Sequence, residues 1–228
     1  MNEIKRCLAN IDAMIEERHL LKHPFYQSWT AGTLPIEALR GYARQYYKHV
    51  EAFPVYLAGI YTHCDSVEDR RLVLRNLIEE DHGPDNHPEL WLRFADGLGV
   101  AREAVLSAEA LPQTAETVST FRRLTVEGDA VSGMAAVYAY EAMVPEVAEV
   151  KISGLKELYG IDDPRALSFF VVHEEADREH REWDRQIIGN MLRDAGDARR
   201  AESASKQALD ALWGLLDGVQ QRYVERAN

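Results

Sequence analysis

The chain has 228 residues, of which 46% are hydrophobic and 28% are charged, a composition typical of a globular domain that is large enough to enclose a polar site. No apolar run approaches the roughly 18 residues of a membrane-spanning helix, and a formal net charge of -12 disfavours nucleic acid and anionic lipid as partners. We therefore expect one soluble domain over residues 1–228 that binds neither nucleic acid nor a membrane.

The N-terminal segment and the cysteines indicate a cytoplasmic protein. Residues 1–19 alternate charged and apolar residues at helical spacing, and they lack the uninterrupted apolar stretch of a signal peptide. The chain has only two cysteines, Cys7 and Cys64, and neither belongs to a C-x-x-C motif. The sequence thus predicts reduced core cysteines, and it argues against a disulfide framework and a thiolate zinc site.

An apolar period of 3.6 residues dominates the chain and predicts an all-α fold. The sequence has no internal repeat and no Ser/Gly linker, so we expect a single bundle of seven or more helices, in which the last twenty residues are the most prone to fray. The predicted helices cover residues 3–22, 35–64, 66–83, 88–98, 129 to beyond 141, 164–195 and 199–226, with shorter segments at 101–109 and 114–127.

Local signals support several of these boundaries. Residues 66–69 resemble a capping box, and Asp129 and Asp163 are expected N-caps. Pro145 is expected to kink the helix that runs past Glu141, because proline removes a hydrogen-bond donor from a helix interior. The segment that follows His23-Pro24 is expected to be a short link between the first helix and the next.

One helical face carries side chains that can bind metal. His173, Asp177 and His180 stand at i, i+4 and i+7 in the segment HEEADREHREW. At about 100° per residue they fall within roughly 60° of one another, so their side chains converge. The alternative is a solvated charged face, because acids and arginines surround these three residues. If a metal is bound, further ligands must come from other helices.

Glu141 is the most informative of the other carboxylates. It is an isolated acid in the apolar run MAAVYAYEAMVP. Burial of a carboxylate in such a setting is costly unless the group meets a cation or a metal ion. Glu141 is therefore a candidate ligand.

Two alternatives exist for the ligands supplied by residues 79–87. Glu79-x-x-His82 matches the Glu-x-x-His pairs of ferritin-like di-iron bundles, but the same pattern recurs elsewhere in the chain and is weak. Glu80 and His87 are seven residues apart and would share a face of a continuous helix, although the Gly-Pro step between them implies a locally unwound segment. Spacing alone leaves both alternatives open.

Several segments resemble one known family. HPFYQSW, YARQYYKHVEAFPVYL, NLIEEDHGPDNHPELW, AVYAYEAMVPEVAEVKISGL and HEEADREHREW are similar to segments of CADD-like proteins, the chlamydial family named for associating with death domains, within the haem-oxygenase-like di-metal oxidases. The resemblance extends from about residue 8 to residue 190 and implies a haem-oxygenase-like bundle related to TenA and to pyrroloquinoline-quinone synthase (PqqC). The metal ligands that it implies are Glu80, His87, Glu141, His173, Asp177 and His180.

This ligand set suits two metal ions. Three carboxylates opposite two divalent ions leave about one positive charge, which a bridging hydroxide or oxo group can neutralise. Mixed imidazole and carboxylate ligation favours iron paired with iron or manganese over metals that prefer thiolates. We therefore expect an oxygenase that uses O₂ and an external reductant.

The resemblance further implies synthesis of p-aminobenzoate for folate biosynthesis, with the aromatic ring taken from a tyrosine of the protein itself. Tyr26 in HPFYQSW is the implied sacrificed residue, and Lys151 is the implied amino donor. Tyr42 and Tyr140 are implied to lie near the oxidising centre. By pattern alone Tyr42 belongs to a core-packing stripe and Lys151 to a charged surface, so these roles depend on the resemblance. No external aromatic substrate is expected, and a homodimer is compatible with the sequence.

Other functions remain open. The same metal site would also suit oxidation of an external small molecule, and the family's name suggests a non-enzymatic protein-interaction module. The cofactorless pyrroloquinoline-quinone synthase and thiaminase chemistries are disfavoured, because neither needs six metal ligands. In addition, neither Cys7 nor Cys64 lies in a ligand segment where a thiol nucleophile would be expected.

Overall fold

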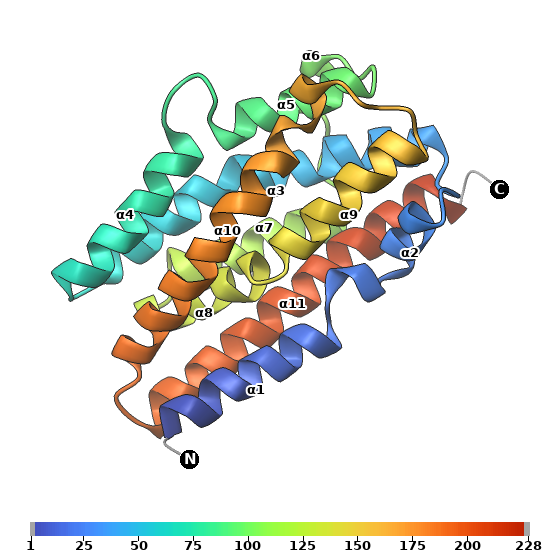
Figure 1. The fold of residues 1–228 in the computed structure, drawn as a ribbon. Coiled ribbons are helices and arrows are strands. Elements are labelled where there is room, and N and C mark those ends of the chain that lie inside the picture. Colours follow the sequence, from blue (N-terminus) through green and yellow to red (C-terminus); the bar gives the residue numbers. More distant parts are fainter. Residues whose placement is uncertain (1–2, 226–228) are drawn as a thin grey trace.

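The computed structural model describes residues 3–225, and of residues 3 and 175–178 it describes the backbone alone. Within this range the chain forms eleven α-helices and one short 3-10 helix and contains no strand, which confirms the predicted all-α fold (Figure 1). The helices are α1 (Glu3–Glu17), η1 (Leu20–Lys22), α2 (Pro24–Thr30), α3 (Ile36–His63), α4 (Val67–Asp81), α5 (His87–Gly97), α6 (Arg102–Leu106), α7 (Pro112–Thr125), α8 (Ala130–Glu141), α9 (Val144–Glu157), α10 (Pro164–Met191) and α11 (Ala195–Tyr223).

Three long helices, α3, α10 and α11, organise the bundle (Figure 1). Helix α11 packs against α8, α7 and α1, whereas α10 packs against α5, α9 and α8, and α3 packs against α7, α4 and α5. Their apolar faces join in one core, and Cys7 and Cys64 are buried without forming a disulfide, as predicted. Because α10 contacts α4, α5, α8 and α9, its inner face meets the helices that carry the other candidate ligands.

The predicted first helix over residues 3–22 is wrong in its last five residues. Helix α1 ends at Glu17, and the side chains of two histidines begin new helical segments. His19 Nδ1 accepts a hydrogen bond from the Leu21 amide at 3.2 Å, and His23 Nδ1 accepts one from the Phe25 amide at 3.0 Å. These caps satisfy amide groups that have no partner within the helices they begin. The segment predicted as a link is therefore helix α2.

The predicted kink at Pro145 is a complete break. Helix α8 ends at Glu141 and α9 begins at Val144, so that Pro145 lies in the first turn of the new helix, where its missing N–H costs nothing. The break matters for the site, because it places Glu141 at a helix end. Asp129 caps α8 and Asp163 caps α10, as predicted.

The C-terminal helix begins earlier than residue 199, because the Asp194 carboxylate accepts hydrogen bonds from the amides of Gly196 and Asp197 at 2.6 and 3.0 Å. The helix continues to Tyr223 and buries Leu216 and Val219. Charged residues interrupt the long helices, and none of the helices in the described range has a stretch long and apolar enough to cross a membrane.

Candidate metal centre

The turn between α4 and α5 brings Glu80 and His87 together. Gly83 adopts a φ of 83°, a left-handed conformation that favours glycine, and Asn86 Nδ2 donates a 2.7 Å hydrogen bond to the Gly83 carbonyl. Asn86 also caps α5 by accepting a hydrogen bond from the Glu89 amide at 3.0 Å. As a result, Glu80 in the last turn of α4 faces His87 at the start of α5, with 2.7 Å between Glu80 Oε2 and His87 Nδ1.

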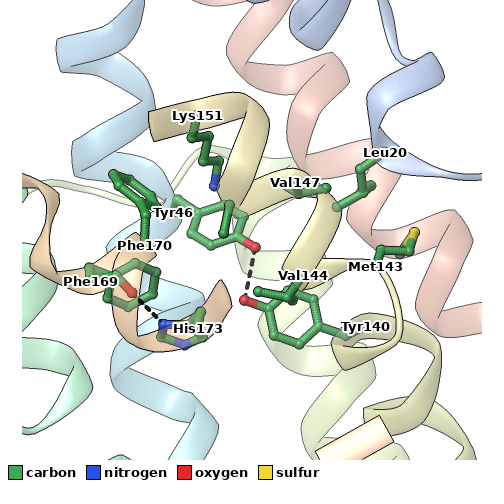
Figure 2. A pocket seen from close by; sticks show the side chains of 11 residues that line it. Leu20, Tyr46, Tyr140, Met143, Val144, Val147, Lys151, Phe169, Phe170 and His173 are labelled. Atoms are coloured by element: carbon green, nitrogen blue, oxygen red, sulfur yellow. Dashed lines mark hydrogen bonds between the residues drawn. The ribbon is translucent and has the colours of Figure 1, made fainter. Parts of the chain in front are cut away.

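His173 completes this first group from α10. Glu80, His87 and His173 are buried, and each offers a donor atom within 4.8 Å of the donor atoms of the other two. The backbone carbonyl of Phe169 lies 2.6 Å from His173 Nδ1 (Figure 2). A carbonyl only accepts hydrogen bonds, so Nδ1 carries the proton and Nε2 has the lone pair for a metal ion.

The environment of His173 favours the neutral imidazole. Burial is the main cause that holds its pKa well below the ordinary value, and the neighbouring ring of His87, 4.3 Å away between centroids, acts in the same direction. A neutral imidazole is the form that binds metal. His173 is therefore prepared as a ligand by its surroundings.

A second group lies around Glu141. Its side chain is 1% exposed, Asn76 Nδ2 donates a 3.0 Å hydrogen bond to Oε1, and His180 Nδ1 lies 3.7 Å from the same oxygen. Burial alone would raise the pKa of Glu141, but its contacts with His180, Asp184 and Asn76 outweigh burial and lower it. Glu141 Oε2 has no hydrogen-bond partner among the described residues. A buried, ionised carboxylate oxygen of this kind fits a metal ligand.

Five of the six predicted ligands lie in two buried groups. Glu80, His87 and His173 converge, and Glu141 and His180 converge beside them. The side chain of Asp177 lies outside the described residues, although the α10 backbone is helical at that position. The competing residue His82 is exposed, so the structure favours the alternative of Glu80 with His87. Two buried groups of imidazoles and carboxylates have the chemistry that iron and manganese accept.

The tyrosine and lysine residues form a separate buried cluster. The hydroxyl of Tyr42 on α3 lies 3.0 Å from the Tyr26 hydroxyl of α2 and accepts a 2.8 Å hydrogen bond from Lys151 Nζ of α9. Tyr26 and Tyr42 have no exposed surface, and Lys151 is 3% exposed. The surface position that the local sequence suggested for Lys151 is therefore wrong, because α9 turns this residue into the bundle.

Five aromatic rings surround the amine of Lys151. Nζ lies between 5.0 and 5.7 Å from the ring centres of these residues, and burial lowers the pKa of Lys151 to about 7. Near neutral pH a large fraction of the amine therefore carries a free electron pair. The rings belong to Tyr26, Tyr42, Tyr46, Trp91 and Phe170.

A cavity lies between the tyrosine–lysine cluster and the candidate metal ligand His173. Lys151 and His173 both line it, and Tyr46 donates a 3.1 Å hydrogen bond to the Tyr140 hydroxyl at its wall (Figure 2). About 10 Å³ of it is open to the centre of a water-sized molecule, which is close to the minimum that holds one such molecule. The remaining wall is apolar and includes Leu20, Met143, Val144, Val147, Ala148, Phe169 and Phe170.

Sequence reasoning missed two residues that contact the candidate ligands. Asn76 binds Glu141 and lies four residues before Glu80 on α4. Asp184 is buried near Glu141, four residues after His180, and thus continues the stripe of candidate ligands by one turn. Helical spacing from the known candidates would have identified both residues.

The chain is similar to proteins of known and related function. Residues 40–213 match a family described as iron-containing redox enzymes. A 4-aminobenzoate synthase of Nitrosomonas europaea is 41% identical over 222 residues, which covers 93% of this chain and 90% of that protein. A 4-aminobenzoate synthase of Chlamydia muridarum is 40% identical over 210 residues, which covers 92% of this chain and 88% of that protein.

The fold is also known. A TenA homologue from Pseudomonas syringae superimposes with a TM-score of 0.81 at 19% sequence identity, covering 95% of this chain and 92% of that one. This likeness confirms the predicted haem-oxygenase-like, TenA-related architecture. At such low identity it carries no information about the reaction.

Proposed function

The chain belongs to the iron-containing redox enzymes and to the family of the 4-aminobenzoate synthases, and from this premise we propose that it makes 4-aminobenzoate from its own Tyr26, with Lys151 as the amino donor. We further propose that two metal ions, iron with iron or manganese, use O₂ and an external reductant for this reaction. The observation that carries the proposal is the buried contact of Lys151 and Tyr26 with the same hydroxyl, that of Tyr42.

The required chemistry explains why a metal centre and a tyrosine cluster occur together. Conversion of a tyrosine side chain to 4-aminobenzoate breaks its Cα–Cβ bond, oxidises Cβ to the carboxylate and replaces the phenolic oxygen by nitrogen. Transfer of that nitrogen from a lysine also breaks the Cε–Nζ bond of the donor. No ordinary side chain is a sufficiently strong oxidant for these steps. When bound, the metal ions would supply that oxidising power from O₂.

Lys151 has the properties of a nitrogen donor. A protonated ammonium has no electron pair to form a new C–N bond, and burial among aromatic rings lowers the pKa of this amine to about 7. Tyr42 holds Nζ through the 2.8 Å hydrogen bond and also contacts the Tyr26 hydroxyl, which is the group that nitrogen must replace. The cluster therefore keeps donor and acceptor in one water-poor compartment.

The size of the cavity supports an internal source of the aromatic ring. The space between Lys151 and His173 accommodates about one small molecule, whereas an aromatic acid has about ten heavy atoms. O₂ meets this limit and an external benzoate precursor does not. The apolar wall also suits O₂, which forms no strong hydrogen bonds.

Isotope labelling tests the proposal directly. Protein that contains ring-labelled tyrosine and ¹⁵N-lysine is purified, loaded with iron with or without manganese, and exposed to O₂ and reductant without chorismate or free tyrosine. We expect release of 4-aminobenzoate that carries both labels, at no more than one molecule per chain, together with the matching loss of mass from the protein. Multiple turnovers on an added small molecule would support the alternative of an external substrate.

Two substitutions test the residue roles. Tyr26→Phe and Lys151→Arg should each abolish product, whereas Lys156→Arg, on the exposed side of the same helix, should not. If Tyr26→Phe and Lys151→Arg both leave the yield unchanged, the assigned roles are wrong. Metal content is measured for each variant, so that loss of product is not confused with loss of the metal ions.

A further inference from the structure

Glu79 contacts the edge of the His180 ring that is turned away from Glu141. Glu79 Oε2 lies 2.9 Å from His180 Nε2, while Glu141 Oε1 lies 3.7 Å from His180 Nδ1. We propose that Glu79 is a positioning residue of the metal centre, which accepts the Nε2–H of His180 and thereby directs Nδ1 to the metal ion. This inference rests on the metal centre of the proposed function but not on its product.

The partners of Glu79 determine which nitrogen carries the proton. Arg75 Nε lies 3.7 Å from the other carboxylate oxygen of Glu79, an ion-pair contact between residues one helical turn apart on α4. An ionised carboxylate accepts hydrogen bonds and has no proton to donate. His180 therefore donates through Nε2, and Nδ1 is the ring nitrogen on the side of Glu141.

The distance on the opposite side of the ring fits shared coordination. Two donor atoms that each lie about 2.1 Å from one metal ion are separated by roughly 3 to 4 Å, depending on the angle between them. The 3.7 Å between His180 Nδ1 and Glu141 Oε1 falls in this range. The two groups therefore stand at a spacing that suits two ligands of one metal ion.

His173 and His180 follow the same rule with opposite nitrogens. The Phe169 carbonyl lies at Nδ1 of His173, so that Nε2 is its metal-facing nitrogen, whereas Glu79 lies at Nε2 of His180, so that Nδ1 is the nitrogen on the side of Glu141. The partner of His180 is a carboxylate, which fixes the ring orientation and also raises the basicity of the coordinating nitrogen. Glu79 is 37% exposed, so the electrostatic part is weakened by solvent and the hydrogen bond carries most of the effect.

Neighbouring side chains restrict the positions of Glu79 and His180. The guanidinium of Arg75 lies 4.4 Å above the Trp183 ring, and that ring is 5.2 Å from the imidazole of His180. Arg75 also reaches Glu179 on α10, with 3.7 Å between Nη2 and the carboxylate. Glu179 thus shares an arginine with Glu79 but contacts no candidate ligand whose side chain the structure describes, which makes it a matched control.

Metal titration of the anaerobic protein tests the proposal. We expect wild-type protein and Glu179→Ala to bind two iron ions per chain with the same affinities. Glu79→Ala should retain one wild-type affinity and weaken the other by about 10- to 100-fold. Glu79→Gln, whose amide oxygen still accepts a hydrogen bond, should weaken it less than Glu79→Ala does. Wild-type affinity at both sites of Glu79→Ala would overturn the proposal.

Long-range ¹H–¹⁵N NMR of the histidine rings in metal-free protein gives a readout that general loss of stability does not change. His180 should carry its proton on Nε2 in wild-type protein and in Glu179→Ala, and should populate both tautomers in Glu79→Ala. An Nδ1–H tautomer of His180 in wild-type protein would also overturn the proposal. If Glu79→Ala does not fold, Glu79→Asp replaces it, because the shorter carboxylate cannot reach Nε2.

These measurements distinguish this inference from the proposed function. Selective loss of one metal ion in Glu79→Ala supports the positioning role even if the wild-type protein releases no 4-aminobenzoate. Conversely, product formed by the wild-type protein together with unchanged metal affinity in Glu79→Ala supports the function and rejects the role of Glu79.

Discussion

Lys151 Nζ donates a 2.8 Å hydrogen bond to the hydroxyl of Tyr42, and both residues are buried. The same hydroxyl contacts Tyr26, so one phenol joins the amine to the proposed source of the aromatic ring. The three residues come from α9, α3 and α2. Their contact depends on how these helices pack, and it has consequences for stability that can be measured.

Burial of Lys151 should make the stability of the protein increase with pH. Its pKa is about 7 in the folded state and near 10.5 when exposed, so between these values the unfolded chain binds more protons than the folded chain. The destabilisation from this residue is complete below pH 7 and disappears as the pH approaches 10.5. Within this window the free energy of unfolding should rise by about 1.4 kcal/mol per pH unit.

Denaturant unfolding of metal-free wild-type protein and Lys151→Met at several pH values isolates this contribution. The variant should be more stable than wild type at pH 7, and the difference should shrink towards pH 10. Lys156→Met serves as the control because Lys156 is exposed, and its stability should follow that of wild type. A constant difference between wild type and Lys151→Met across this range would contradict the lowered pKa.

Removal of the Tyr42 hydroxyl should affect both of its partners. Tyr42→Phe keeps the ring but leaves the Lys151 amine and the Tyr26 hydroxyl without this hydrogen bond. We expect a loss of about 1–3 kcal/mol in the free energy of unfolding and a lower yield of 4-aminobenzoate. Tyr159→Phe is the control, since Tyr159 is partly exposed and its hydroxyl makes a long, 3.4 Å hydrogen bond to the Trp29 carbonyl and a backbone contact at Leu34, and it should cost less than about 0.5 kcal/mol.

His87 and His82 distinguish the two alternatives for the ligands of residues 79–87. His87 is buried against Glu80, whereas His82 is exposed. His87→Ala should therefore lower the iron content by about one ion per chain, and His82→Ala should leave it unchanged. Elemental analysis of anaerobically loaded protein measures both, and equal metal loss in the two variants would show that the structure misplaces the site.

The backbone of α9 must stay close to Trp29 for the tyrosine cluster to pack. A Cβ atom on Gly154 would meet Trp29 Nε1 at 2.5 Å, and Trp29 in turn packs on Tyr26 with 6.1 Å between ring centres. Gly154→Ala should cost about 1–3 kcal/mol in the free energy of unfolding and reduce the yield of product.

Gly214 provides the matched comparison for Gly154. A Cβ atom there would meet no atom within 4 Å, and the residue lies inside α11. Gly214→Ala should therefore stabilise the protein by about 0.5–1 kcal/mol, because alanine loses less backbone entropy in a helix. Thermal unfolding should show a lower stability for Gly154→Ala and a higher stability for Gly214→Ala. A stabilising Gly154→Ala would contradict the close approach of α9 to Trp29.

The residues that share one helix were predictable from their spacing. His173 and His180 lie seven residues apart and both face inward, because the helical period is a local property of the chain. The same period would have identified Asp184. The helix starts at Asp129 and Asp163 were predictable for the same reason, because capping is local. The caps at His19 and His23 were missed because histidine is an unusual cap.

Tertiary structure decided the rest of the site. Glu80 meets His87 only because the chain turns at Gly83, and spacing along a continuous helix could not decide between this pair and Glu79 with His82. Glu79 and Glu80 are adjacent in the chain but make different contacts, Glu80 with His87 and Glu79 with His180.

The sequence by itself determined the all-α fold and the inward stripe on α10, since both arise from a period of 3.6 residues. Only the packing of α2, α3 and α9 decided that Lys151, which stands among charged neighbours in the chain, is buried beside Tyr42 and Tyr26. Burial is the sum of contacts from distant segments, and it sets the pKa of the amine. The chemistry proposed for this lysine therefore depends on tertiary structure rather than on its local sequence.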